Sequence, residues 1–449
     1  MSFYNIQASN NIAIITEDQI YTYTDLLEKV EQFPFDSNEK KLVLILSKNQ
    51  IEYIGAYVSA LNQNHAVMLM SADTNTDLLD HIVREYKPYW IIGDQCFDGY
   101  RQNELIQEKI TEDNIQIHTD LAVLLSTSGT TGSQKFVRLS YENILANAEA
   151  IVEYLQIDKN ERAIMNLPLS YSYGMSIVNS HLLAGATLLL TNQSVMEKSF
   201  WSFVEQHEAT SLPGVPFTYQ MLKRIGFLKK DLPHLKTLIQ AGGHLNEKLV
   251  KEFGEYTRQT EKRFYVMYGQ TEASPRISYI PPSRILDKPS TIGISIPGGE
   301  LSLDPETSEL IYKGPNVMMG YAACLEDLAK GNDLNGILHT GDTAEVDEEG
   351  FFSITGRMKR FIKLFGLRIN LDEVERKLES SIQSTIACTG NDDKLIIAVE
   401  HEQYIETVKV LIEEFYKLHR TAFKVVVLNN IPRFPNGKTD YNRLKEQCL

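Results

Sequence analysis

The residues best suited to chemistry form one stretch, Ser126-Thr127-Ser128-Gly129-Thr130-Thr131-Gly132-Ser133-Gln134-Lys135. Its two glycines lack a Cβ, so the backbone can turn tightly and approach a ligand. Hydroxyl and backbone N–H groups offer donors to anionic oxygens, and Lys135 adds a full positive charge. Since the apolar run 121–125 before it is typical of a buried strand, the stretch predicts a polyphosphate-binding loop at a strand end. Composition alone leaves a plain surface loop as the alternative.

This stretch differs from the phosphate loop of the common nucleotide hydrolases, which reads Gly-x-x-x-x-Gly-Lys-Ser/Thr and opens a helix. Here Gln134 precedes Lys135 and Phe136 follows it. The sequence Gly-Lys-Thr occurs at 437–439, but Pro432 stands where the first glycine of that motif is required. The Walker interpretation therefore fails.

The bulk composition is that of a soluble globular protein. The chain has 449 residues, 43% hydrophobic and 23% charged, which predicts two or three domains. A net charge of −15 argues against a general nucleic-acid binder or a protein of anionic membrane surfaces. Residues 1–5 show no secretory signal, and apolar stretches such as 182–190 are too short to span a membrane. We expect a cytoplasmic protein with no nucleic-acid or membrane partner.

Cysteine and histidine spacing gives no sign of a metal centre. The four cysteines, at 96, 324, 388 and 448, form no CxxC pair, and the ten histidines form no HExxH. We therefore expect reduced thiols, as in a cytoplasm, and no structural metal site.

Apolar runs alternate with helical patterns up to about residue 270, which predicts layered α/β subdomains with largely parallel sheets. Helices are expected at 141–155 and 246–256, where apolar residues recur on one face. Strands are expected at 41–46, 66–70, 89–93, 122–126, 187–190, 237–240 and 263–267.

The pattern changes twice towards the C-terminus. Short strands with Gly, Pro and Asp-rich turns over 290–355 predict a small β unit. Beyond residue 356 we expect an α+β unit with a helix at 371–378, a hairpin around 391–393 and a long helix at 405–419. The predicted fold class is therefore α/β, with a large N-terminal domain (1–355) and a small mobile α+β domain (356–449).

Further motifs follow the glycine-rich loop in a fixed order. They are NLPLSYSYGMSIVNSHLLAGATLLL (166–190), QAGGHL (240–245), YGQTEAS (268–274), HTGD (339–342) with GRMKRFIKLFGLRINLDEVE (356–375), and PRFPNGKTDYNRLK (432–445). In this order the chain resembles the superfamily of adenylate-forming enzymes: acyl- and aryl-CoA synthetases, nonribosomal peptide synthetase adenylation domains and firefly luciferase. The resemblance covers residue 120 to the end.

The resemblance implies ATP and Mg²⁺ as cofactors and assigns residues to them. Glu272 is the expected Mg²⁺ ligand, since Mg²⁺ usually takes one or two carboxylates beside phosphate oxygens. Tyr268 is expected to stack on adenine, and Thr271 to hydrogen-bond the α-phosphate. The whole nucleotide set comprises Thr127, Ser128, Gly129, Thr130, Thr131, Gly132, Lys135, Gly242, Gly243, Tyr268, Gly269, Thr271, Asp342 and Arg357.

Ribose recognition and catalysis are implied for the later motifs. Asp342 would accept the ribose hydroxyls with Arg357 beside it. Lys438, catalytic with Thr271 and Glu272, would lie between the acid carboxylate and the α-phosphate. Lys359 takes the position of the family's hinge, about which the small domain would swing between adenylation and thiol transfer.

The acid pocket is implied to include Tyr171, Tyr173, Val215, Gln240, Ala241 and Gln270. Residues 170–175 carry no charge to pair with an ammonium, and a buried unpaired ammonium is costly, so an α-amino acid is disfavoured. The pocket suggests a small or medium acid, aromatic and hydroxylated acids included, rather than a long fatty chain. Tyr171 stands where many acyl-CoA synthetases have histidine, and Gln134 where the family mostly has proline.

The implied activity is AMP-forming activation of a carboxylic acid, followed by transfer to CoA or to the phosphopantetheine of a carrier protein. Lys359, Arg360, Lys363 and Arg368 are expected to form a basic patch facing that acceptor. Three alternatives remain: an amino-acid adenylation enzyme that loads a carrier, a ligase or oxygenase with a non-thiol acceptor, and a nucleotide-binding regulator. Retention of Lys438, Glu272 and Asp342 disfavours the regulator.

Overall fold

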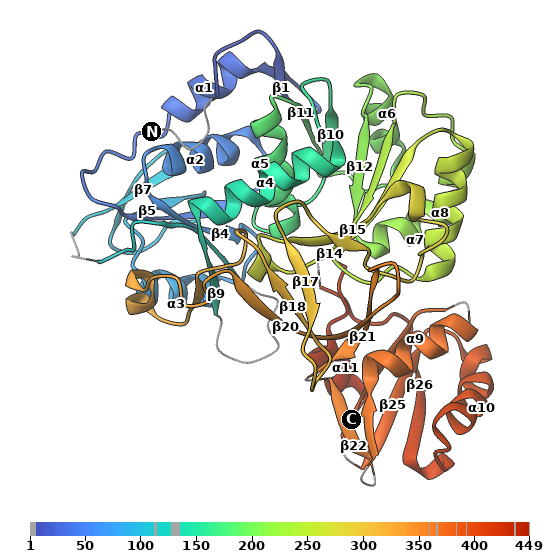
Figure 1. Ribbon diagram of the computed structural model, residues 1–449. Helices are drawn as coiled ribbons and strands as arrows, with labels where there is room; N and C mark the ends of the chain where they lie inside the picture. The colour runs from blue at the N-terminus through green and yellow to red at the C-terminus, as the bar shows by residue number, and fades with distance from the viewer. Residues whose placement is uncertain are drawn as a thin grey trace.

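The computed structural model describes residues 6–111, 115–126, 135–358, 360–364, 367–382, 384–391, 393–434 and 437–448. Two large sheets dominate the N-terminal part of the chain (Figure 1). The first has the order β16 (Ile294–Ser295), β15 (Arg276–Ile280), β14 (Arg263–Gly269), β13 (Thr237–Gln240), β12 (Ser211–Gly214), β10 (Arg162–Met165), β11 (Thr187–Leu190), β1 (Ile12–Ile15) and β2 (Ile20–Thr22). The second has the order β19 (Gly320–Ala322), β9 (Phe136–Ser140), β8 (Leu121–Ser126), β4 (Ala66–Ser71), β3 (Leu42–Ser47), β5 (Trp90–Ile92), β7 (Ile106–Lys109) and β6 (Tyr100–Asn103).

The central strands are apolar along their whole length because both faces of each sheet are covered. In β11, for example, Leu188 belongs to the core between the sheets and Leu189 to the core on the other face. Side chains of a strand alternate between faces, so unbroken apolar runs are typical of sheets buried on both sides. In the first sheet, the adjacent strands β1, β11, β10, β12, β13 and β14 pair in parallel, as predicted.

Helices supply the other layers. The shared core between the sheets contains α2 (Ile51–Asn62), α4 (Tyr141–Leu155) and α5 (Ser172–Ala184), which lie centrally in Figure 1. The outer face of the first sheet is covered by α6 (Lys198–Gln206), α7 (Pro216–Arg224) and α8 (Glu247–Gln259). The outer face of the second sheet is covered by α3 (Thr76–Tyr86), and α1 (Tyr23–Glu31) packs beside α2.

The predicted β unit and C-terminal α+β domain are both present. A four-stranded antiparallel sheet has the order β17 (Glu300–Leu303), β18 (Glu309–Lys313), β20 (Ile337–Val346) and β21 (Phe352–Arg357). The small domain contains the hairpin of β22 (Phe361–Leu364) and β23 (Leu367–Asn370) and the sheet of β24 (Ile386–Asn391), β25 (Lys394–Val399) and β26 (Phe423–Val427). Its helices are α9 (Leu371–Ser381), α10 (Ile405–Tyr416) and α11 (Tyr441–Cys448).

The predicted elements agree with the structure to within a few residues. Helix α4 and strands β11 and β13 have the predicted bounds. The sequence pattern did not predict β12, because Pro213 and Gly214 near its end resemble a turn. The domain boundary between residues 355 and 356 stays a prediction; Arg376 of α9 donates hydrogen bonds across it to the carbonyls of Ile354 and Thr355 in β21.

A short turn connects β14 to β15 and carries the 3₁₀ helix η2 (Thr271–Ala273). Asn316, fully buried, donates from Nδ2 to the carbonyls of Ala273 (2.6 Å) and Arg276 (2.9 Å). Its Oδ1 accepts from the hydroxyl of Tyr312 at 2.7 Å. The amide of Asn316 therefore connects the end of η2 to the start of β15.

We predict that Asn316→Ala lowers the free energy of unfolding by about 1–3 kcal/mol, because it weakens hydrogen bonding to buried carbonyl groups. Thermal unfolding of the purified variant measures the change. Asn103→Ala, on the exposed strand β6, is the matched control and should change stability by less than about 0.5 kcal/mol. Equal stability of the two variants would show that the turn does not depend on Asn316.

Candidate active site

The predicted site residues gather where β12, β13 and β14 end. Val215 follows β12, Ala241 follows β13, and Tyr268 and Gly269 close β14. These strands are parallel neighbours, so their carboxyl ends lie at the same sheet edge. Ligands of open α/β sheets bind at that edge. Tyr171, the N-cap residue of α5, also lies at this edge.

Close approaches of the backbone explain two of the predicted glycines. Gly242 has a φ of +86°, and a Cβ there would lie 2.4 Å from the hydroxyl oxygen of Tyr171. A Cβ on Gly269 would lie 1.8 Å from the carbonyl oxygen of Pro275. Any larger residue would push the strand ends away from Tyr171 and from the turn that carries Glu272.

Asp342 lies at the centre of a polar group contributed by three strands. The hydroxyl of Tyr268 donates to its Oδ2 at 2.5 Å, and Arg357 Nε lies 3.3 Å from its Oδ1. Asp342 and Arg357 are register partners across β20 and β21, which explains why two motifs distant in sequence meet. Burial raises the pKa of Asp342, while Arg357 and the Tyr268 hydrogen bond oppose that rise. The structure brings these three predicted residues together.

Tyr268 is therefore fixed by its hydroxyl. Burial is the main cause that raises its pKa well above the ordinary value, and the adjacent Asp342 carboxylate raises it further. The phenol stays protonated at neutral pH and acts as a donor. Its predicted stacking on adenine stays a prediction.

The predicted magnesium ligand is also held in place. Tyr321 Oη donates to Glu272 Oε1 at 2.8 Å, and Thr271 Oγ1 lies 3.2 Å from Ser172 Oγ of α5. In the described part of the chain, no group of three or more His, Cys, Asp or Glu residues could hold a metal ion. One carboxylate nevertheless fits Mg²⁺ that takes its remaining ligands from phosphate and water. The sequence pattern did not predict Tyr321 as a partner, since it lies in an unrelated strand.

Lys438 reaches the same edge from the small domain. Its Nζ lies 6.0 Å from the ring centroid of Tyr171. Phe434 N–H donates to Lys438 O at 2.8 Å, and a Cβ on Gly437, whose φ is +80°, would lie 3.1 Å from Val215. Burial and the neighbouring Arg357 lower the pKa of Lys438, whereas Glu272 and Asp342 raise it. The lysine therefore shares one electrostatic environment with the other predicted residues.

The remaining predicted pocket residues are distributed around this edge. Ala241 and Val215 are buried, and Gln240 Nε2 donates to the carbonyl of Gly243 at 2.9 Å. Tyr173 lies deeper, at 1% exposure, and its hydroxyl donates to the carbonyl of Ile239 at 2.9 Å. Its ring meets that of Tyr171 edge-on, with centroids 6.2 Å apart. Gln270 is partly exposed, and the pocket roles stay predictions.

Some predicted residues lie outside the described residues: Thr127, Ser128, Gly129, Thr130, Thr131 and Gly132 of the loop, and the hinge Lys359. Lys135, at the end of that loop, is exposed. The predicted basic patch loses one member, because Arg360 is paired with Asp372 and Glu375 and packs 3.6 Å from the ring centroid of Tyr441. A guanidinium committed to two carboxylates is not available to an external acceptor.

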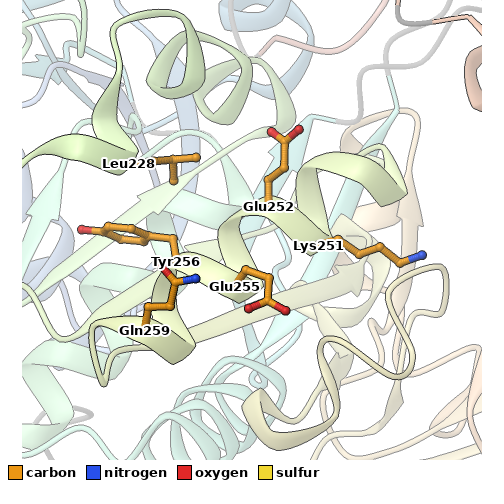
Figure 2. Close-up of a pocket in the computed structure, with 6 residues that line it drawn as sticks. All are labelled: Leu228, Lys251, Glu252, Glu255, Tyr256 and Gln259. Atoms are coloured by element: carbon orange, nitrogen blue, oxygen red, sulfur yellow. The ribbon is translucent and has the colours of Figure 1, made fainter.

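A separate hollow lies on the surface over α8, between that helix and Leu228 (Figure 2). Its other lining residues are Lys251, Glu252, Glu255, Tyr256 and Gln259. None of them belongs to the predicted site.

Comparison with known proteins identifies the family of this chain. Residues 5–322, more than two thirds of the chain, match the AMP-binding enzyme family. The chain belongs to this family. It is 27% identical to peroxisomal OPC-8:0-CoA ligase 1 of Arabidopsis thaliana, over 94% of this chain and 87% of that protein. It is 24% identical to 2-succinylbenzoate–CoA ligase of Listeria innocua, over 97% and 96% of the two chains.

Solved structures of AMP-binding enzymes share the fold. O-succinylbenzoate CoA synthetase of Bacillus subtilis in complex with AMP superposes with a TM-score of 0.78 at 22% identity, covering 97% of this chain and 95% of that one. ATP-bound MatB of Rhodopseudomonas palustris gives 0.76 at 20% identity, covering 98% and 96%. The expected fold class and family are thus confirmed. No helix in the described ranges combines the length and apolar character needed to cross a bilayer.

We predict that acid-dependent pyrophosphate exchange declines with rising pH at a pKa below the ordinary lysine value of about 10.4, because the role predicted for Lys438 requires its charge and its pKa is lowered. A cation with a lowered pKa is present below that pKa and is lost as the pH rises through it. Initial rates between pH 7 and 10.5 measure the decline. The Lys438→Arg variant stays charged over this range, so its remaining exchange rate should no longer fall with pH. If the variant shows the same decline as the native enzyme, the decline belongs to another titrating group.

Proposed function

We propose that this AMP-binding enzyme is an AMP-forming acid–thiol ligase. A carboxylate oxygen of the acid attacks the α-phosphorus of ATP, the bond from that phosphorus to the oxygen bridging to the β-phosphate breaks, and pyrophosphate leaves. A thiol then attacks the acyl carbon of the adenylate. The bond from that carbon to the phosphate oxygen breaks, AMP leaves with the electron pair, and the thiol proton passes to solvent. The observation that carries the proposal is the meeting of Lys438 with Glu272, Asp342 and Arg357 beside Tyr171.

Each side chain has a role in this scheme. The Lys438 ammonium would offset negative charge on the attacking carboxylate and the bridging oxygen, in a partly buried place where such a charge acts strongly. Asp342, held by Tyr268 and Arg357, would accept the ribose hydroxyls. Glu272 would hold Mg²⁺, which neutralises charge on the phosphate oxygens when bound.

The acceptor is proposed from the relatives, which are named CoA ligases and synthetases. CoA is the simplest thiol consistent with them, and a phosphopantetheinyl carrier protein offers the same chemical group. The pairing of Arg360 with Asp372 and Glu375 removes part of the argument for a carrier. We further propose that 1–355 binds ATP and acid, that 356–449 brings Lys438, and that the enzyme works in the cytoplasm.

We predict acid-dependent exchange of pyrophosphate into ATP that requires Mg²⁺, and AMP with thioester once CoA is added. A panel of carboxylic acids with labelled pyrophosphate, followed by mass spectrometry of the CoA products, provides the measurement. Formation of ADP and phosphate would overturn the mechanism. Thioester with a holo-carrier but not with CoA would instead assign the acceptor.

Lys438→Ala is the internal control for this assignment. It should slow adenylation by roughly 10²–10³-fold, the effect of losing one preorganised charge. Thioester formation from chemically made acyl adenylate should persist, because the second step does not need this cation. An equal loss in both half-reactions would show that Lys438 is structural.

We predict that Lys359→Pro separates the two half-reactions. Proline fixes φ near −65°, so a hinge at this position could no longer take both backbone conformations. Pyrophosphate exchange should continue while thioester formation falls sharply, as single-turnover assays of each step would measure. If both steps keep their native rates, residue 359 is not the hinge.

A further inference from the structure

A small cavity lies behind the tyrosine pair at the strand ends. It is bounded by the buried Tyr173, by Ser176, Ser180 and His181 of α5, by Ser211 of β12 and by Arg276 of β15, with apolar side chains completing its wall. Its free space is enough for about one water molecule. Lys438 lies over Tyr171 and Arg276 lies over Tyr173, so the two cations flank the tyrosine pair.

Three side chains that line this cavity each have one buried polar atom without a hydrogen-bond partner among the described residues. Arg276 Nε, His181 Nε2 and Ser211 Oγ have no partner, and their residues are 3%, 2% and 1% exposed. Buried polar groups are nearly always paired, so such a cluster indicates a missing ligand or water. His181 Nδ1 lies 2.8 Å from the carbonyl of Ile177, which places its proton on Nδ1 and leaves Nε2 as an acceptor.

The charge of Arg276 is the strongest part of this observation. Its guanidinium carbon lies 4.1 Å from the ring centroid of Tyr173, and among the described residues it forms no ion pair with a carboxylate. A cation–π contact offsets only a small part of the cost of burying an ion. The ring therefore does not balance the charge, and an anion in the cavity would.

We infer that Arg276 binds a second carboxylate at the far end of the acid, so that the substrate is a dicarboxylic acid. This inference rests on the proposed function, because it takes the acid's reacting carboxylate to lie beside Lys438. The tyrosine pair then packs along the middle of the acid, and Ser211 donates to the distal carboxylate. Only one oxygen of the distal carboxylate enters the cavity, where it contacts Arg276 Nε.

Sequence patterns did not single out Arg276. Arg276 lies two residues after the YGQTEAS motif, in β15. Side chains alternate between the two faces of a strand, so the sequence leaves open which face carries Arg276. The pairing of β15 with β14 decides which face of β15 lines the cavity. The local sequence pattern contains no information about that pairing. The predicted pocket included only uncharged residues for this reason.

The test compares each dicarboxylic acid with its monomethyl ester in pyrophosphate exchange, for aliphatic and aromatic pairs of several lengths. In the native enzyme, kcat/KM for the best diacid should exceed that for its ester by roughly 10²-fold, because the ester leaves the guanidinium unpaired. Arg276→Gln should lose this preference and raise the rate with the ester. Arg258→Gln, an exposed arginine on α8, is the matched control and should keep it.

Other outcomes overturn the inference in distinguishable ways. Equal rates with diacid and ester, or a preference that survives Arg276→Gln, would show that Arg276 does not read the substrate. If Arg276→Gln and Arg276→Lys both lose exchange with every acid, the guanidinium is structural. If the native enzyme exchanges pyrophosphate with none of the acids tested, the proposed function itself is overturned.

Discussion

The turn between β14 and β15 is the constraint on which the site depends. Gly269 lies so close to the carbonyl of Pro275 that no side chain fits there, and Asn316 binds the carbonyls at the end of η2 and at the start of β15. Tyr268 precedes this turn, Thr271 and Glu272 lie in it, and Arg276 follows it. The nucleotide side and the acid side of the proposed reaction are thus connected by the nine residues 268–276. Displacement of this turn would affect both sides at once.

The charges of the site come from parts of the chain far apart in sequence. Asp342 and Arg357 meet through the register of β20 and β21, and Lys438 follows Gly437, which lies close to Val215. Burial lowers the pKa of Lys438, whereas the nearby carboxylates of Glu272 and Asp342 oppose that shift and balance its charge. The overall charge of −15 is therefore a poor guide to the local environment. A site for anionic ligands can exist on an acidic protein because close charges outweigh distant, screened ones.

Within the small domain, the charge of Arg360 is taken up by internal ion pairs. Arg360 contacts two carboxylates and the face of Tyr441, and Glu375 also accepts from the backbone N–H of Cys388 at 2.6 Å. Burial raises the pKa of Glu375, and Arg360 opposes that rise. A basic run in a sequence is thus not equivalent to a basic surface. The partner of each charge has to be known before a docking face is assigned.

Local spacing was sufficient for much of this protein. The periodicity of apolar residues predicted α4, β11 and β13 with their observed bounds, because each side chain's environment there repeats with the element's own period. The ordered motifs predicted that Tyr268, Glu272, Asp342, Arg357 and Lys438 belong to one site, and the described geometry brings them together. Tertiary structure alone decided that Tyr173 is buried, that Arg360 is paired and that Arg276 lines a buried cavity. Burial and pairing depend on strand register and on residues distant along the chain, and a local pattern contains no information about either.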